Sequence, residues 1–398
     1  MLTLFRNRLF LAVASGHFVI DVLNSIVPVL LAVLATSLSL TNAQIGLALT
    51  LFTFGGSLSQ PLFGWLADRF PRRPTLLAGA GAAWMALWFL GITVAQTWWQ
   101  MLACLLVGVL GSGLFHPIGT ASAAAAHPAR AGSATALFFF CGQIGLASGP
   151  LIAGLLFRTS GVLGVLPICL VALLPACLLL AAPAAPPRPL AAPRGERTVA
   201  RAAVAATTAF IVLVAVRSSI QAAYMAFLPK LFADRGWNPA AYGALAGTFM
   251  LTAAIGNVIT GELADRQGMR VATVWPLLLG VPAGIICLWA PTPATAFVGC
   301  ALAGLLIGGQ HSVLVVHAQR LLPARQGFAA GLILGFTFAA GGIGVWLGGL
   351  AADQVGLLPV MQAITLLGVP AALLALTLPG RAGLPQASLA EAAQSSAS

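Results

Sequence analysis

Residues 64–73 read GWLADRFPRR, and the pattern returns at 261–270 as GELADRQGMR. Asp68 and Asp265, at matching places in the two copies, are 197 positions apart. Each copy ends an apolar stretch and carries the basic residues of a short loop. A pattern that returns at this distance predicts two equivalent structural units, so the two halves of the chain can be compared position by position.

The composition shows what surrounds these units. Of 398 residues, 60% are hydrophobic and only 7% are charged, and the mean hydropathy is +0.99. A water-soluble protein of this size needs far more polar surface, so lipid must be its outer solvent. The composition predicts a polytopic membrane protein and speaks against a soluble enzyme. The net charge of +11 comes from arginines spread over short loops, so we expect no nucleic-acid partner.

Twelve apolar segments are long enough for membrane-spanning helices, which need about 20 residues each. The segments are 9–34, 44–66, 74–95, 99–122, 133–157, 163–182, 204–232, 239–262, 271–290, 294–319, 327–352 and 357–379. Residues 183–203 are rich in proline and arginine, which oppose helix formation and insertion. The predicted fold is an all-α membrane protein with two pseudo-symmetric six-helix bundles, at 1–182 and 204–379. A cytoplasmic linker at 183–203 joins them, and a disordered cytoplasmic tail follows at 380–398.

Three further matches support the duplication. HPARAG at 127–132 pairs with LPARQG at 322–327, His116 with His311, and GQIG at 142–145 with GGIG at 341–344. Parallel halves of this kind place a working site between them, near the middle of the bilayer.

The basic residues predict the orientation. Of the 19 lysines and arginines, fifteen fall on the amino-terminal side of the membrane, three on the other, and Arg217 lies within a span. The positive-inside rule then places both termini and the linker in the cytoplasm. We expect a multi-pass, monomeric protein of a bacterial inner membrane.

The decapeptide Gly64–Arg73 resembles the G-x-L-a-D-r-x-G-r-[RK] signature of the major facilitator superfamily, with Pro71 in place of its second glycine. The copy at 261–270 keeps that glycine as Gly268. Within the superfamily, residues 10–155 are similar to the fosmidomycin-resistance branch. The shared features are Gly16-His17-Phe18 with Asp21 and Ser25, Gln44-Ile45-Gly46, Gln60-Pro61 with Gly64, and GSGLFHP at 111–117. The resemblance implies a proton-coupled exporter of small, often anionic or toxic compounds.

Asp21 is the only carboxylate that we place in the interior of a predicted span, and His17 lies one turn earlier on the same helical face. An ionised carboxylate there needs a partner, and an imidazole titrates near neutral pH. The pair therefore predicts a proton-coupling site, to which we add His116 and His311. The alternative is a hydrogen bond that only satisfies two polar side chains.

Arg217 lies near the middle of the seventh span, with Gln221 and Tyr224 on roughly the same face. An arginine there stays charged and needs Asp21, a carbonyl group or an anionic substrate as its partner. We expect it to anchor the substrate across a cavity from Asp21. The further predicted substrate-binding residues are Gln221, Tyr224, Asn24, His116 and Gln310. The alternative is a fixed Arg217–Asp21 ion pair that braces the two halves.

The repeated loop motif predicts a cytoplasmic gate. Its members are Asp68, Arg69, Arg72, Arg73, Asp265 and Arg266. A carboxylate near helix ends of the opposite bundle can hold that side shut through charge-assisted hydrogen bonds. The alternative is that these charges only set the topology.

No cofactor or metal site is expected. The six cysteines lie in apolar runs without a C-x-x-C pair or a nearby histidine, and no nucleotide-binding motif is present. The sequence therefore predicts an alternating-access, proton-driven antiporter for efflux of small anionic or toxic compounds, as in drug resistance. The alternatives are an importer or uniporter of a small organic anion, and a non-transporting sensor or assembly factor on the same fold.

Overall fold

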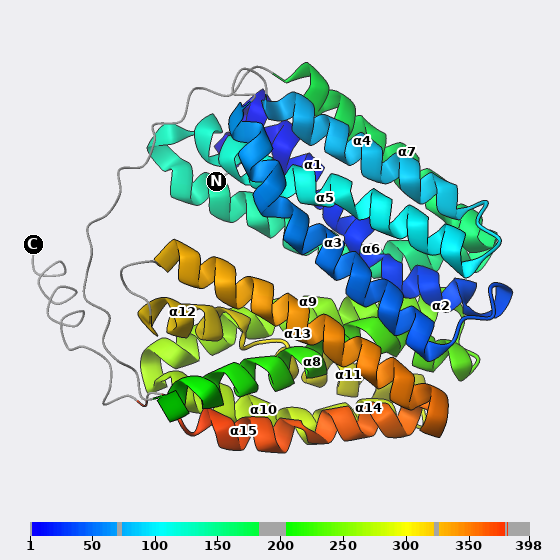
Figure 1. The fold of residues 1–398 in the computed structure, drawn as a ribbon, viewed down its shortest axis with the longest axis vertical. Coiled ribbons are helices and arrows are strands. Elements are labelled where there is room, and N and C mark those ends of the chain that lie inside the picture. Colours follow the sequence, from blue (N-terminus) through cyan, green and yellow to red (C-terminus); the bar gives the residue numbers. More distant parts are fainter. Residues whose placement is uncertain (1, 70–73, 183–203, 322–325, 379, 381–398) are drawn as a thin grey trace, which may run out of the picture.

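The computed structural model describes residues 2–69, 74–182, 204–321, 326–378 and 380 (Figure 1). The predicted linker at 183–203, nearly all of the predicted tail, and the gate residues Arg72 and Arg73 lie outside the described residues.

The described chain is helical. The first half consists of η1 (Leu2–Arg6), α1 (Arg8–Ser25), α2 (Val27–Ser37), α3 (Asn42–Arg69), α4 (Pro74–Ile92), α5 (Trp98–Ala126), η2 (Pro128–Arg130), α6 (Ala131–Ser160), η3 (Gly161–Gly164) and α7 (Val165–Ala181). The second half consists of α8 (Val204–Asp234), α9 (Pro239–Gln267), α10 (Met269–Leu288), α11 (Pro293–Ile307), α12 (His311–Leu321), α13 (Gln326–Val355), α14 (Leu357–Leu366) and α15 (Gly368–Ala375).

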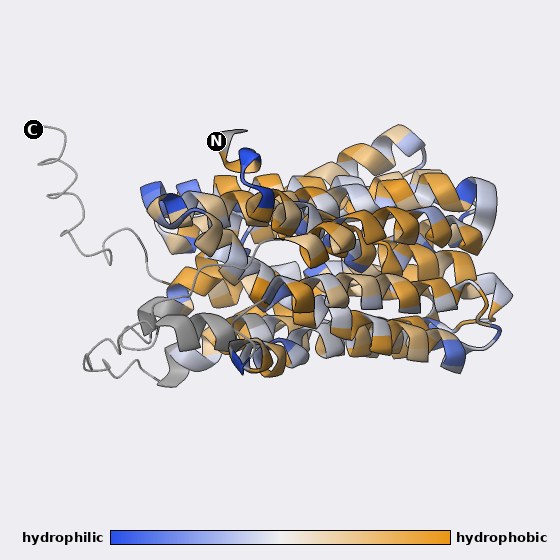
Figure 2. Ribbon diagram, turned by 90° about the horizontal axis from the view of Figure 1, so that it is seen from above, coloured by the Kyte–Doolittle hydropathy of each residue, from blue (hydrophilic) through white to orange (hydrophobic). Residues whose placement is uncertain are grey.

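By length and composition, the described helices allow twelve membrane crossings. Eleven stretches are long and apolar enough to cross a membrane, and one of them, Pro128–Ala181, holds both α6 and α7. Hydrophobic residues run along the bundles and hydrophilic ones gather mainly at the helix ends (Figure 2). The predicted fold class is thereby confirmed.

Three of the predicted spans are interrupted in the described residues, among them the twelfth, at Leu367 between α14 and α15. The first breaks between α1 and α2 at Ile26, where Pro28 enters the first turn of α2. The tenth breaks between Ile307 and His311, where Gly308 and Gly309 interrupt the helix. Such breaks leave backbone carbonyls without helical partners, so polar side chains must satisfy them.

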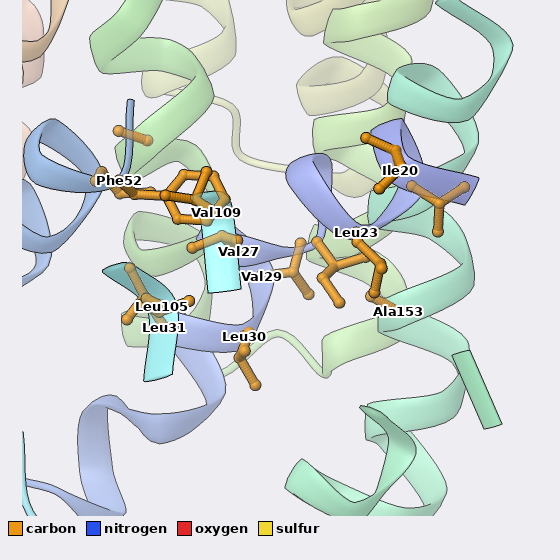
Figure 3. Close-up of a cluster of buried hydrophobic side chains, with 14 of the residues drawn as sticks. Ile20, Leu23, Val27, Val29, Leu30, Leu31, Phe52, Leu105, Val109 and Ala153 are labelled. Atoms are coloured by element: carbon orange, nitrogen blue, oxygen red, sulfur yellow. The ribbon is translucent and has the colours of Figure 1, made fainter. Parts of the chain in front are cut away.

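The first crossing forms the centre of the first bundle. Ile20, Leu23, Val27, Val29, Leu30 and Leu31 of α1 and α2 pack with Phe52 of α3, Leu105 and Val109 of α5, and Ala153 of α6 (Figure 3). The same crossing also reaches the other bundle, because α2 contacts α8 and α9. A movement of α1 can therefore be passed to both bundles.

The two bundles meet at one end and diverge toward the side on which η1 and the last turn of α15 lie (Figure 1). We call that side the terminal face and the other the remote face. At the remote face, α3 packs on α13, where Thr50 donates a hydrogen bond to the Gly342 carbonyl oxygen at 2.6 Å. There α6 also packs on α9 through Gly154 and Gly243, whose backbones touch. The structure therefore shows a conformation that is closed at the remote face.

Candidate functional site

The polar centre of the first bundle consists of His17 and Asp21 on α1 and His116 on α5, which we call the His–Asp cluster. His17 Nε2 lies 3.2 Å from Asp21 Oδ2, and His116 Nε2 lies 3.4 Å from Asp21 Oδ1. The structure thus brings together three of the four predicted proton-coupling residues. The carboxylate bridges two imidazoles, which ties α1 to α5.

Backbone carbonyls set the orientation of both imidazoles. His17 Nδ1 lies 2.8 Å from the Phe138 carbonyl oxygen on α6, and His116 Nδ1 lies 2.8 Å from the Ser112 carbonyl oxygen on α5. A carbonyl oxygen only accepts hydrogen bonds, so each Nδ1 must carry a hydrogen. Each Nε2 is therefore the atom that can gain or lose a proton toward Asp21.

Asn24 completes the hydrogen bonding of the carboxylate. Its Nδ2 donates to Asp21 Oδ1 at 3.1 Å and to the Ser112 hydroxyl at 3.0 Å. Asn24 was predicted to bind substrate, and here it is half-buried and linked to the His–Asp cluster. Ser112 was not among the predicted site residues, although it belongs to the GSGLFHP segment that carried the family resemblance.

Glycines allow α6 to close the cluster on one side. A Cβ atom added at Gly142 would overlap the His17 ring and lie 2.6 Å from Asp21 Oδ2. A Cβ at Gly145 would run into the Phe18 carbonyl oxygen. Gly142 and Gly145 of the GQIG segment therefore have no room for a side chain, because α1 and its polar side chains pack directly against them.

The His–Asp cluster is buried, so the protonation of its side chains affects its stability. The side chains of His17 and Asp21 are 3% and 8% exposed, and that of His116 is 20% exposed. An ionised carboxylate at this depth is costly without donors, so each gap between Nε2 and oxygen needs a hydrogen. The three ligand atoms lie within 4.8 Å of one another, a spacing that a metal ion would also accept. Because each imidazole already faces a carboxylate oxygen at hydrogen-bonding distance, we assign protons to these gaps.

Arg217 forms the polar centre of the second bundle and is completely buried. Its Nη2 donates to the Gly308 and Ile307 carbonyl oxygens at 2.9 and 3.3 Å, and its Nε donates to Gln310 Oε1 at 3.3 Å. These carbonyls are the ones freed where α11 ends, and the negative end of the helix dipole lies there. The break in the tenth crossing is thus bound by Arg217.

The predicted Arg217–Asp21 pair is not formed. Each residue is bonded within its own bundle, and the two are 196 positions apart, within the offsets of the sequence repeat. They therefore occupy corresponding places, where each ties the first crossing of its bundle to the fourth. His311, the predicted partner of His116 in the repeat, is half-buried at the start of α12.

The other predicted substrate-binding residues differ in exposure. Gln221 on α8 is half-buried, whereas Tyr224 and Gln310 are completely buried. The Tyr224 hydroxyl is 2.8 Å from the Thr365 hydroxyl, and its ring stacks on Phe249. In this conformation Tyr224 is a packing residue of the second bundle, which the helical spacing alone could not reveal.

The predicted gate residues lie at helix ends on the terminal face. Arg69 ends α3, is exposed, and its guanidinium lies over the Trp65 ring. Arg266 on α9 is exposed and pairs with Glu262 of its own helix, and Asp265 is exposed. Asp68 is in the last turn of α3. The bundles diverge here, so the gate stays a prediction for the opposite conformation.

A contact that the sequence reasoning missed holds the remote face. Asp353, in the last turn of α13, accepts hydrogen bonds from the backbone amides of Asn42 at 2.7 Å and Ala43 at 3.0 Å. These amides begin α3, so a carboxylate is favourable there. The available signal was that an acidic residue in the last turn of a helix opposes its own helix dipole.

Comparisons with known proteins agree with this architecture. A family model described as Major Facilitator Superfamily matches residues 13–219 and again 209–397. The chain is 31% identical over 364 residues to the Uncharacterized MFS-type transporter YfnC of Bacillus subtilis (strain 168), over 89% of this chain and 88% of that protein. It is 29% identical over 363 residues to the Fosmidomycin resistance protein of Escherichia coli (strain K12), over 87% and 86% of the two chains.

A solved structure shares the fold at low sequence identity. It is the inward-facing and occupied conformation of a bacterial homolog to the human lysosomal transporter Spinster, with a TM-score of 0.80 and 15% identity over 93% of this chain and 96% of that one. The resemblance found in the repeated loop motif is thereby confirmed, and members of this family are transporters and not enzymes. The chain belongs to the major facilitator superfamily.

Proposed function

We propose that the protein is a proton-driven exporter of small anionic or toxic compounds in a bacterial inner membrane, with both termini in the cytoplasm. The observation that carries this proposal is the His–Asp cluster: a carboxylate buried at mid-membrane between two imidazoles, each with Nε2 directed at it. Such a cluster binds protons in a place where any change of charge is costly.

The position of the cluster supports coupling to movement. Its hydrogen bonds join α1 to α5 and α6, and α1 continues through the kink at Ile26 into α2, which contacts the second bundle. Loss of a proton removes a hydrogen bond between α1 and α5 and thereby changes the relative stability of the two conformations. Proton binding and bundle rotation therefore share one structural element.

The proposed substrate is an anion because of the charge on Arg217. Its hydrogen-bond partners in the described residues are neutral, so its positive charge persists near the middle of the membrane. An anionic substrate between the bundles is stabilised by that charge at a distance. We assign direct substrate contacts to the half-buried Asn24, His116 and Gln221, whereas Arg217 is completely buried within the second bundle and acts through its charge. The similarity to a protein named for fosmidomycin resistance supports efflux.

Transport in proteoliposomes tests this function. Asp21→Asn should abolish uphill flux driven by a pH gradient and leave counterflow of substrate down its own gradient measurable. The assay uses purified protein, a panel of organic anions and drugs, and an internal pH indicator. The matched control is Asp234→Asn, which alters an exposed carboxylate that pairs with Lys230 on its own helix.

The alternatives predict different results. A symporting importer acidifies the lumen together with substrate entry, and a uniporter shows counterflow that is independent of the pH gradient. A sensor or assembly factor shows no flux with any compound. Loss of both uphill flux and counterflow in Asp21→Asn, with protein yield unchanged, would contradict the proton-carrier role of the cluster.

A further inference from the structure

The two imidazoles of the His–Asp cluster have different surroundings. The His17 side chain is 3% exposed, and its ring stacks on Phe138 with 4.0 Å between ring centroids. Gly142 lies against its edge so closely that no side chain fits between them. Water therefore has little access to His17 Nε2.

His116 faces a more open environment. Its side chain is 20% exposed, and its Nε2 lies 3.4 Å from the carboxylate, against 3.2 Å for His17. Its Nδ1 is bonded to the Ser112 carbonyl oxygen on its own helix, so among the described residues its hydrogen bond to α1 is the one to Asp21, beside an edge contact with the His17 ring. His116 can therefore leave the carboxylate without breaking a bond that holds its ring in place.

The other ionisable groups near the cluster are few. The helices that pack on α5 are α1, α3, α4 and α6. In the membrane interior of α5 and these described helices, the ionisable side chains besides His116 are His17, Asp21, the Cys104 thiol on α5 and the Cys141 thiol on α6. Arg8, Asp68, Arg69 and Arg158 belong to the ends of the helices. Of these groups, the two imidazoles and the carboxylate are within hydrogen-bonding distance of one another, so a proton near Asp21 is held by one of these three side chains.

We infer that His116 exchanges the transported proton with the space between the bundles, whereas His17 keeps its proton and positions the Asp21 carboxylate. This inference rests on the proposed proton coupling and assigns its proton to one atom, His116 Nε2. In the loaded state both imidazoles are cations, Asp21 is ionised, and the cluster has a net charge of +1. Release transfers the Nε2 proton of His116 to water and leaves a neutral imidazole, so the cluster becomes neutral.

The release changes the contacts between α1 and α5. The neutral His116 presents a lone pair to Asp21 Oδ1, so that hydrogen bond is lost, while Asn24 still bridges Asp21 and Ser112. His17 keeps Asp21 in place through a bond to the other oxygen, Oδ2. The carboxylate is thus held for the next proton, which makes His17 a positioning residue.

Nitrogen NMR of the purified full-length protein tests the assignment directly. The chain has five histidines, so ¹⁵N-histidine labelling gives a small set of ring signals that report the protonation of each nitrogen. The pH is varied from about 5 to about 9, which brackets the ordinary imidazole value. His116→Gln and His17→Gln assign the signals, and His127→Gln, outside the cluster, serves as the assignment control.

The expected result is that the Nε2 proton of His116 is lost first as the pH rises, before any change in the ring signals of His17. In transport, His116→Gln should lose the pH dependence of uphill flux, whereas His17→Gln should keep it with a displaced midpoint. Titration of His17 before His116, or of both rings together, would overturn the inference. If His116 alone titrates and yet no pH gradient drives transport, the proton assignment stands and the proposed function fails.

Discussion

Replacing Asp353 with asparagine should release the remote face. The carboxylate of Asp353 accepts hydrogen bonds from two backbone amides at the start of α3, one on each oxygen. Asparagine keeps one acceptor and turns an NH₂ group toward the other amide. One hydrogen bond to a charged group is then lost, which is worth about 1.5 kcal/mol at the lower end of the range appropriate to an exposed site. That value corresponds to a shift of about tenfold toward the conformation open at the remote face.

Distance measurements between spin labels can detect this shift. Labels at Thr159, at the end of α6, and at Gln354, at the end of α13, report the separation of the bundles at the remote face, and both positions are exposed. The measurement requires a variant whose native cysteines are replaced. The population with the longer distance should grow in Asp353→Asn and stay constant in Asp234→Asn. Equal distance distributions in the two variants would refute the idea that Asp353 holds the bundles together.

Three more outcomes are expected. Gly142→Ala should lower the free energy of unfolding by about 2 kcal/mol, because the new methyl group overlaps His17. In contrast, Gly132→Ala, which meets nothing within 4 Å, should unfold at the wild-type temperature or above, and equal melting of the two variants would contradict the packing argument. Arg217→Gln should destabilise the protein by about 2 kcal/mol, because it leaves the buried carbonyls at the end of α11 unbonded, and it should weaken binding of anionic substrates more than that of neutral ones. An equal loss for both substrate types would assign Arg217 a purely structural role. Reporter fusions and thiol labelling should place both termini and residues 183–203 in the cytoplasm, and a periplasmic linker would overturn the predicted orientation.

Part of the candidate site could be predicted because it is local. His17 and Asp21 are four residues apart, and helical geometry alone places them on one face. The duplicated motif suggested His116 and His311, but it could not show that His116 reaches Asp21, since that contact depends on how α5 is rotated against α1. The hydrogen bonds of Asn24 could not be predicted for the same reason, because its amide turns toward Asp21 and Ser112.

Arg217 and Asp21 do not form an ion pair, because each has other hydrogen-bond partners. The two residues stand at corresponding positions of the two halves, and each is hydrogen-bonded inside its own half. The partners of Arg217 are the carbonyls at a break in the tenth crossing, and the apolar run 294–319 gave no sign of that break beyond the pair Gly308–Gly309.

The sequence by itself determined that lipid surrounds the protein. It also determined the number of crossings, the duplication and the family. These properties depend on the length and hydropathy of single segments and on a short motif, and each segment satisfies its backbone hydrogen bonds as a helix wherever it lies. The tertiary structure alone decided which polar groups meet: Asp21 with His116, Arg217 with the end of α11, and Asp353 with the start of α3. Inside a bilayer, helix faces are matched by close packing of small residues and by hydrogen bonds between distant segments, and neither is encoded in the hydropathy of one segment.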